Sequence, residues 1–290
     1  MRFHVVVIRP PGHLHASAFT EMAELITAGL ITLGYSVTVG ENSWESTAVN
    51  ILFGAHHLLN PKGGWRELLP TRTILYNLEP LVPYAPWATK AFADGFAQYP
   101  VWDYAQANAA YRMQRQWPGL WYTLPIGYMP QWTRVVPQGT RDVDVLFYGS
   151  LSPRRQQVLQ ALRDSGLRVQ VLFGVYGSER DAWMARSRMI LNWHQAPGYP
   201  FESVRVGYLL ANRSVVVSEA IRDADDNAQR WQAGIAWTST DQVVATCQRW
   251  AQDPLQCRDL AYQVWQRMQT LHESDVLASV LDQMATDHQL

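Results

Sequence analysis

The sequence predicts an α/β protein of two Rossmann-like domains that face each other across a cleft, with helices at the C-terminal end. Three observations support this fold class. Apolar runs alternate with segments of helical periodicity, which is typical of parallel sheets covered by helices on both faces. The alternation stops around residues 130–142 and then begins again. The chain has 290 residues, which is enough for two domains.

The first series opens with a continuous apolar run, Phe3–Ile8, as expected of a strand buried on both faces. Apolar residues at helical spacing follow from Phe19 to Leu33, and Gly34 supplies a stop signal. A further helix is predicted over 104–117, before Pro118. Three more apolar segments predict strands: 35–39, 49–54 and 73–77.

Residues 134–142 form the predicted linker, because prolines and a glycine interrupt any period there. A second series of strands and helices follows it. The predicted strands are 143–149, 167–174, 188–193 and 214–219. The predicted helices are 153–166, 178–187 with a capping box from Ser178 to Asp181, 200–211, and most of the chain from Asp241 on. The predicted domains are 1–133 and 143–270, with a helix at 271–290 that packs back on the first domain.

Composition excludes several classes of protein. The formal charge is −1, so nothing favours a broad nucleic-acid or membrane-surface partner. Cys247 and Cys257 have neither metal-ligand nor disulfide-scaffold spacing and are interpreted as reduced thiols. The opening apolar run is too short for a signal sequence, and no transmembrane segment is predicted. We therefore expect a cytoplasmic protein.

Two adjacent arginines, Arg154 and Arg155, stand at the start of a predicted helix. Ser152 is a natural N-cap and Pro153 suits the first helical position, so both arginines fall in the first turn. The helix dipole disfavours cations there by about 0.3–1 kcal/mol each. A bound anion would reverse this effect, because exposed N–H groups and both guanidiniums would then act together. The alternative is that both arginines point into water.

Glu202 stands near the start of another predicted helix, which Pro200 is expected to open. Its carboxylate either stabilises the helix start or accepts hydrogen bonds from the vicinal hydroxyls of a ribose. Neither a P-loop motif nor a Gly-x-Gly-x-x-Gly motif is present, which disfavours ATP hydrolysis and dinucleotide redox chemistry. A diphosphate held by a loop, a helix end and arginine is the ligand that these features favour.

Two segments resemble the carboxyl-terminal domain of GT-B glycosyltransferases, in particular the CgeB-like branch. "VLFYGSLSPRR" is similar to that branch's strand, Gly-Ser turn and arginine pair. "FESVRVGYLLANRS" is similar to its Phe-Glu-Ala-x-Ala-Cys-Gly segment, with Glu202 and Gly207 at matching positions. In the first half, "LYNLEPL", "VWDYAQAN" and "LPIGYMP" also resemble stretches of related bacterial proteins.

The resemblance implies that the second domain binds a nucleotide-diphosphate sugar and the first domain an acceptor. It implies that Glu202 holds the donor ribose and that Arg154 or Arg155 holds the diphosphate, with Gly149 and Ser150 close to it. In such enzymes cationic side chains and a helix end offset the diphosphate charge, so no metal and no other cofactor is expected. The acceptor, whether a glycan, a protein or a small molecule, stays open.

One position departs from the pattern of the retaining relatives. Many of these have two glutamates eight positions apart, the second matching Glu202, but here the first position is His194. This departure leaves the stereochemistry of transfer open. His194 is either a donor contact or a satisfied histidine at a strand end. Asn192 and Tyr199 lie in the same region and are further candidate donor contacts.

An inverting enzyme needs a base that takes the proton of the acceptor. The candidates lie in loops of the first domain: His13 and His15, Glu79, and Asp103, of which His13 is preferred. Asp103 is alternatively a helix cap. A zinc site from His13, His15, His56 and His57 lacks a carboxylate or cysteine at fitting spacing. Two other functions stay open: a nucleotide-sugar epimerase or hydrolase, and a non-catalytic module that keeps the fold.

Overall fold

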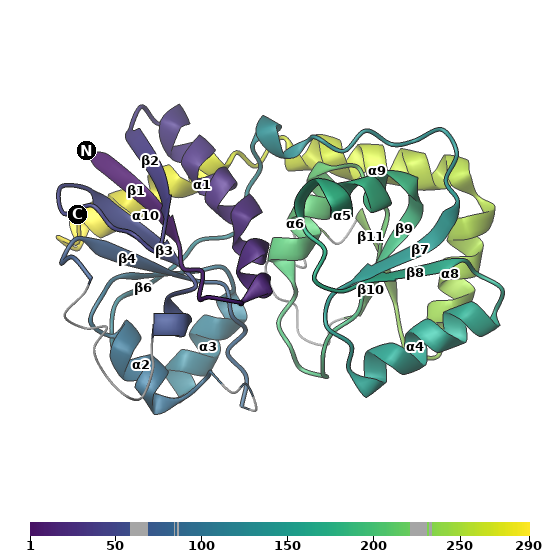
Figure 1. Cartoon of the computed structure of the whole chain (residues 1–290), viewed down its shortest axis with the longest axis horizontal. Helices are drawn as coiled ribbons and strands as arrows, with labels where there is room; N and C mark the ends of the chain where they lie inside the picture. The colour runs from purple at the N-terminus through teal and green to yellow at the C-terminus, as the bar shows by residue number, and fades with distance from the viewer. Residues whose placement is uncertain (59–68, 84, 86, 221–230, 232–233) are drawn as a thin grey trace. The chain divides into compact units, whose positions relative to one another are not determined.

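A computed structural model describes residues 1–58, 69–83, 85, 87–220, 231 and 234–290 of the chain (Figure 1). The chain divides into two compact units. The first unit contains Met1–Met129 and Leu271–Leu290, and the second contains Pro130–Thr270. Each unit is built on one parallel sheet with helices packed on it, which confirms the predicted α/β class.

The sheet of the first unit has the strand order β2-β1-β3-β4-β5-β6, with every pair parallel. Its strands are β1 (Arg2–Val7), β2 (Ser36–Glu41), β3 (Val49–Phe53), β4 (Thr73–Asn77), β5 (Val101–Asp103) and β6 (Trp121–Thr123). The strands β3 and β4 are buried along their whole length and β1 is buried after its first residue. This burial explains why the central strands read as continuous apolar runs. The sequence missed β5 and β6, which have only three residues each.

The helices of the first unit are α1 (Thr20–Thr32), α2 (Lys90–Phe96), α3 (Gln106–Gln114) and α10 (Glu273–Thr286), with the 3-10 turns η1 (Leu14–Phe19) and η2 (Ala55–Leu58). The helix α3 is shorter than the predicted 104–117. At its start Ala105 is extended, and at its end Gln116 takes a left-handed conformation with a φ of 52°. Neither backbone conformation can belong to an α-helix.

The helix α10 returns to the first unit and packs against α1 (Figure 1). Tyr128 N–H donates to Leu271 O at 2.7 Å, and Glu273 N–H donates to Tyr128 O at 3.0 Å. The backbone N–H of Gly127 donates to the buried carboxylate of Glu273 at 2.7 Å. The start of α10 is therefore held by the backbone of residues 127–128.

The sheet of the second unit has the order β11-β10-β9-β7-β8, again with every pair parallel. Its strands are β7 (Val143–Tyr148), β8 (Val169–Leu172), β9 (Ser187–Asn192), β10 (Val216–Glu219) and β11 (Ile235–Thr238). Its helical segments are η3 (Pro130–Trp132), α4 (Pro153–Asp164), α5 (Gly177–Arg186), α6 (Ser203–Ala211), α8 (Val243–Gln252) and α9 (Pro254–Met268). The chain leaves β7 for β8 on one side and then adds β9 on the other side. This reversal is a topological switch point, where ligands of open α/β sheets bind.

Two predicted helix starts in this unit are wrong. The capping box from Ser178 to Asp181 does not form, because α5 begins at Gly177 and its N-cap Tyr176 makes no side-chain cap. Asp181 instead accepts a hydrogen bond from the Tyr208 hydroxyl at 2.8 Å. The helix predicted from Pro200 begins at Ser203, so Glu202 is its N-cap residue and lies outside its first turn.

Among the described residues, no helix is long and apolar enough to cross a membrane.

The close approach of residues 127–128 to α10 yields a stability prediction. A Cβ at Gly127 would lie 2.8 Å from Glu273 Cα and 2.9 Å from Glu273 N, which are backbone atoms that cannot yield cheaply. We expect Gly127→Ala to destabilise the first unit by about 1–3 kcal/mol, the usual cost of overpacking. Calorimetric unfolding measures the change. Gly139→Ala is the control, since a Cβ there meets nothing within 4 Å. Identical unfolding of both variants would contradict this account of the α10 contact.

Candidate functional site

The candidate site lies in the second unit, at the carboxyl ends of β7, β9 and β10. The strand β7 leads through Gly149 into the start of α4, and β9 leads into residues 193–195. Glu202 stands at the N-cap of α6, and Glu219 ends β10. Because β7 and β9 flank the switch point of the sheet, segments far apart in sequence meet there.

The start of α4 has the predicted form. The Ser152 hydroxyl accepts a hydrogen bond from Arg155 N–H at 3.3 Å, and Pro153 occupies the first helical position. Gly149 has a φ of 140°, a conformation that side chains disfavour. Its backbone stands close to Arg205, since a Cβ there would lie 3.4 Å from Arg205 Nη2.

Arg155 is buried, with only 3% of its side chain exposed, and it forms hydrogen bonds to several segments of the site. Its Nε donates to Trp193 O at 2.8 Å, and its Nη1 donates to Ser150 O at 3.0 Å and to Gln195 Oε1 at 2.7 Å. Its Nη2 donates to Glu202 Oε1 at 3.1 Å. Burial lowers the pKa of this guanidinium to about 10, which still leaves it charged at neutral pH. One side chain thus joins three segments of the site.

Arg154 is more accessible than Arg155, with 24% of its side chain exposed. Both of its terminal nitrogens contact the carboxylate of Glu219, the Nη1–Oε2 contact at 2.8 Å. Its Nη1 also donates to His194 O at 3.2 Å, and its guanidinium lies 5.0 Å from the Trp193 ring. The cations in the first turn of α4 are therefore opposed by carboxylates of the protein itself, which offsets the unfavourable helix dipole.

A third arginine, Arg205, joins the site from the first turn of α6. Its Nη1 lies 2.8 Å from Glu202 Oε2, an ion pair without the geometry of a hydrogen bond. The same nitrogen donates to Asn192 Oδ1 at 3.4 Å, and the guanidinium lies 5.4 Å from the Tyr148 ring. Glu202 consequently stands between two guanidiniums, those of Arg155 and Arg205.

His194 shares the carboxylate of Glu219 with Arg154. Its Nδ1 lies 3.2 Å from Glu219 Oε2. Burial opposes ionisation of Glu219, but hydrogen bonds from His194 and Arg154, and their charges, lower its pKa to about 2. Glu219 is therefore ionised throughout the physiological range.

Several buried polar atoms of this site have no hydrogen-bond partner in the described structure. They are Trp193 Nε1, His194 Nε2, Glu202 Oε2 and Ser203 Oγ. Buried polar groups are nearly always hydrogen-bonded, so the loop after β9 and the start of α6 hold four exceptions to that rule.

The other predicted residues of this unit lie close to the same loops. Ser150 Oγ lies 3.3 Å from Gln195 Oε1, and Asn192 is fully buried at the end of β9 with its Nδ2 bonded to Ser218 Oγ at 3.1 Å. Tyr199 lies close enough to Arg155 to act on its charge. Sequence reasoning missed Arg205, Gln195 and Glu219. Only Arg205 had a signal, since it follows Glu202 by three positions on one helix.

The predicted bases of the first unit lie at the carboxyl edge of its own sheet. The rings of His13 and His57 are 4.4 Å apart, and those of His56 and His57 are 4.0 Å apart. His56 Nε2 stands 3.7 Å from Glu79 Oε1. Burial raises the pKa of Glu79 to about 7, whereas burial and the neighbouring imidazoles lower that of His56 to about 3. Near neutral pH His56 is thus uncharged and Glu79 is about half ionised.

Asp103 is a buried acceptor of hydrogen bonds that fix the surrounding loops. Its oxygens accept hydrogen bonds from Asn77 Nδ2 at 2.8 Å, Ala105 N at 2.9 Å and Asn108 Nδ2 at 3.0 Å. Asn108 also bonds the backbone of residues 79 and 81. Burial raises the pKa of Asp103 to about 7 against these hydrogen bonds. Asp103 thus positions the loop that carries Glu79.

The histidines of this edge are His13, His15, His56 and His57, whose rings lie next to one another. Among the residues that the structure describes, no group of three or more His, Cys, Asp or Glu side chains is arranged to hold a metal ion. His13 and His15 pack edge to face, with ring centroids 5.8 Å apart.

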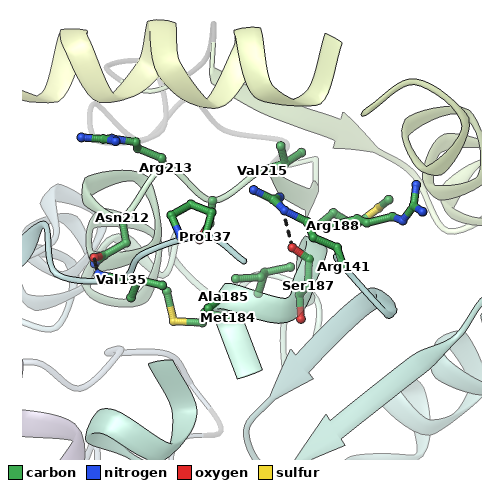
Figure 2. Close-up of a pocket in the computed structure, with 13 residues that line it drawn as sticks. Val135, Pro137, Arg141, Met184, Ala185, Ser187, Arg188, Asn212, Arg213 and Val215 are labelled. Carbon is green, nitrogen blue, oxygen red and sulfur yellow. Dashed lines mark hydrogen bonds between the residues drawn. The ribbon is translucent and has the colours of Figure 1, made fainter. Parts of the chain in front are cut away.

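A small pocket lies at the opposite, amino-terminal edge of the second sheet (Figure 2). It is bounded by Pro137, by Ser187 at the start of β9 and by Val215 just before β10. Arg141 spans it and donates to Ser187 O at 3.2 Å. The interior has room for about one water molecule, so it is too small for a nucleotide.

Comparisons with known proteins identify the fold. No protein-family model matches the sequence. Solved structures match almost the whole chain. HepE of Anabaena, solved with UDP and glucose, has a TM-score of 0.64 and 13% identity over 99% of this chain and all of its own. The trehalose-6-phosphate synthase OtsA has a TM-score of 0.63 and 11% identity over 98% and 99%. AviGT4, a glycosyltransferase of avilamycin A biosynthesis, has a TM-score of 0.59 and 16% identity over 98% and 97%. The chain therefore has the GT-B fold.

Sequence relatives are three uncharacterized proteins of Acanthamoeba polyphaga mimivirus. One is 30% identical over 86 residues, which cover 29% of this chain and 10% of the relative. Another is 29% identical over 109 residues, 37% of this chain and 36% of the relative. The matches thus span between a tenth and just over a third of these relatives.

The different burial of the two arginines yields a stability prediction. We expect Arg155→Ala to destabilise the second unit by about 3–5 kcal/mol, because it removes a buried charge that pairs with Glu202 and leaves two carbonyls without their donor. Arg155→Lys is expected to restore little, since an ammonium cannot form the same fork. Arg154→Ala should destabilise the second unit less than Arg155→Ala. Denaturant unfolding measures each, with exposed Arg163→Ala at the far end of α4 as control. Equal losses for Arg154→Ala and Arg155→Ala would contradict these assignments.

The low pKa of Glu219 predicts a pH dependence. The folded protein holds this carboxyl deprotonated down to about pH 2, below its ordinary value of 4.5. Its contribution to stability is therefore fully present above pH 4.5 and is lost as pH falls toward 2. The stability gap between wild type and Glu219→Gln should shrink over that interval in thermal unfolding. A gap that does not vary with pH would show that Glu219 is not ionised in its ion pairs.

Proposed function

We propose that this protein is a glycosyltransferase that moves a sugar from a nucleotide-diphosphate donor to an acceptor hydroxyl. One observation carries the proposal: three arginines converge at a helix start, at the switch point of a parallel sheet, beside polar atoms that have no partner. A diphosphate matches this combination of guanidiniums and helix end. The GT-B fold supports it, since HepE was solved with UDP and glucose.

The contacts suggest separate roles for the three arginines. Arg154 and Arg205, each about a fifth to a quarter exposed, would contact the phosphates. Arg155 is saturated by its own partners and would hold the loops in place. Gly149 and Ser150 would allow the phosphates to approach the backbone. With guanidiniums and a helix end as the positive charges, this mechanism requires neither a bound metal nor another cofactor.

Glu202 would accept hydrogen bonds from the ribose hydroxyls of the donor. The Glu202 side chain is 18% exposed and accepts one hydrogen bond, from Arg155, so its carboxylate has further lone pairs. His194 and Tyr199 would line the rest of the donor site, whereas Asn192 is fully buried behind it and accepts a hydrogen bond from Arg205. His194 is the best placed of these, since its buried Nε2 has no partner among the described residues.

In the proposed reaction, the bond from the anomeric carbon to the phosphate oxygen breaks and its electron pair leaves with the nucleoside diphosphate. The acceptor oxygen forms the new bond, and its proton passes to a base. The guanidiniums are prearranged to stabilise the charge that develops on the leaving group. If transfer inverts configuration, Glu79 or His13 would serve as the base, with a pKa of about 7 favouring Glu79.

The donor site is tested with a panel of nucleoside diphosphates and their sugars in thermal unfolding. A ligand at about a hundred times its Kd should raise the midpoint by roughly 5–10 °C. We expect Arg154→Ala to weaken binding about 10- to 100-fold, the loss of a charge-assisted contact, and Arg163→Ala to leave it unchanged. Glu202→Gln should weaken the binding of ribonucleotides more than the binding of their 2′-deoxy forms. No shift with any nucleotide would refute the proposal.

Turnover separates transfer from other reactions of the same donor. With the donor identified above, release of nucleoside diphosphate is measured with and without a panel of sugar acceptors. Release that depends on an acceptor supports transfer. Release without one would indicate a hydrolase, and binding without any release would indicate a non-catalytic nucleotide-binding module.

A further inference from the structure

Glu219 makes with Arg154 the same paired contact that a phosphate would make. Each terminal nitrogen of the guanidinium contacts one oxygen of the carboxylate: Nη1 contacts Oε2 and Nη2 contacts Oε1. Carboxylates and phosphates bind the guanidinium fork in the same bidentate manner. The two ligands therefore cannot occupy this edge of Arg154 together.

We propose that Glu219 competes with the donor diphosphate for Arg154 and thereby determines how tightly the protein binds nucleoside diphosphates. The proposal rests on the proposed function, because it assumes that the diphosphate reaches this arginine. It assigns an affinity-determining role to a residue outside the motifs that resemble known families.

Accessibility separates the Arg154–Glu219 pair from the Arg155–Glu202 pair, and its two-pronged contact separates it from the Arg205–Glu202 pair. The side chains of Arg154 and Glu219 are 24% and 15% exposed, so a ligand can reach the contact. The Arg155–Glu202 pair is closed by comparison, since Arg155 is 3% exposed and has four other contacts that hold it. An exchange of partners is therefore far easier at Arg154.

The net charge of the site also favours competition between Glu219 and the diphosphate. Arg154, Arg155 and Arg205 supply three positive charges, and Glu202 and Glu219 supply two negative ones, so these five side chains together carry +1. A nucleoside diphosphate brings about two to three negative charges at neutral pH. The site then becomes negative overall, and like charges brought together at a binding site are costly. Removing the charge of Glu219 relieves this cost.

The groups around Glu219 make Gln the informative replacement. Its carboxylate faces Arg154 and His194, and no other charged side chain among the described residues forms an ion pair with it. Glutamine keeps the size of the side chain and one acceptor oxygen, so it preserves the packing while removing the charge.

The experiment is calorimetric titration of wild type, Glu219→Gln and the control Glu179→Gln with UDP, or with whichever nucleoside diphosphate binds wild type. Glu179 is exposed in the first turn of α5, on the same unit. We expect Glu219→Gln to bind on the order of 3- to 10-fold more tightly, as removal of one competing charge implies, with no change for Glu179→Gln.

A double-mutant cycle locates the effect. In an Arg154→Ala background, Glu219→Gln should tighten binding clearly less than it does in wild type, because the contested guanidinium is gone and only the change in net charge is left. Unchanged or weaker binding by Glu219→Gln, in a variant that still unfolds cooperatively, would overturn the competition and show that Glu219 orients Arg154 toward the ligand. If wild type and variant both bind no nucleoside diphosphate, the proposed function itself fails, and the competition fails with it.

Discussion

The buried guanidinium of Arg155 is the contact on which the rest of the second unit's site depends. It joins the loop after β7, the loop after β9 and the N-cap of α6. A buried charge is tolerated only when it is paired and fully hydrogen-bonded, so these segments must stay in register with one another. The positions of Arg154, His194 and Glu202 follow from that requirement.

Both units use the same topology to collect their polar side chains. In each sheet the first strand lies between the second and the third, which places a switch point beside it. His13 and the His56–His57 pair follow the strands that flank the switch point of the first unit, as Arg154 and His194 do in the second. The two edges differ in charge. Guanidiniums and carboxylates dominate the second, whereas the first holds imidazoles and a carboxyl group whose pKa is raised by burial to about 7.

Local signals predicted a large part of this architecture. Long apolar runs located the central strands because those strands are buried on both faces. Ser152 and Pro153 located the start of α4 because capping is a short-range interaction. The failures were also local. At α5 the predicted capping box is absent, and Asp181 contacts Tyr208. At α6 the helix begins after Pro200, and Glu202 pairs with Arg155. In both places a tertiary contact takes the side chain that the local start signal would have used.

Three features follow from the order of residues alone: the α/β alternation, the division into two series and the presence of two arginines in the first turn of a helix. These are properties of neighbouring residues. Only the tertiary structure decided which anion faces each arginine. Glu219 lies 65 positions after Arg154, and Glu202 lies 47 after Arg155. No short-range pattern relates residues so far apart, and they meet because parallel strands end at the same edge of one sheet.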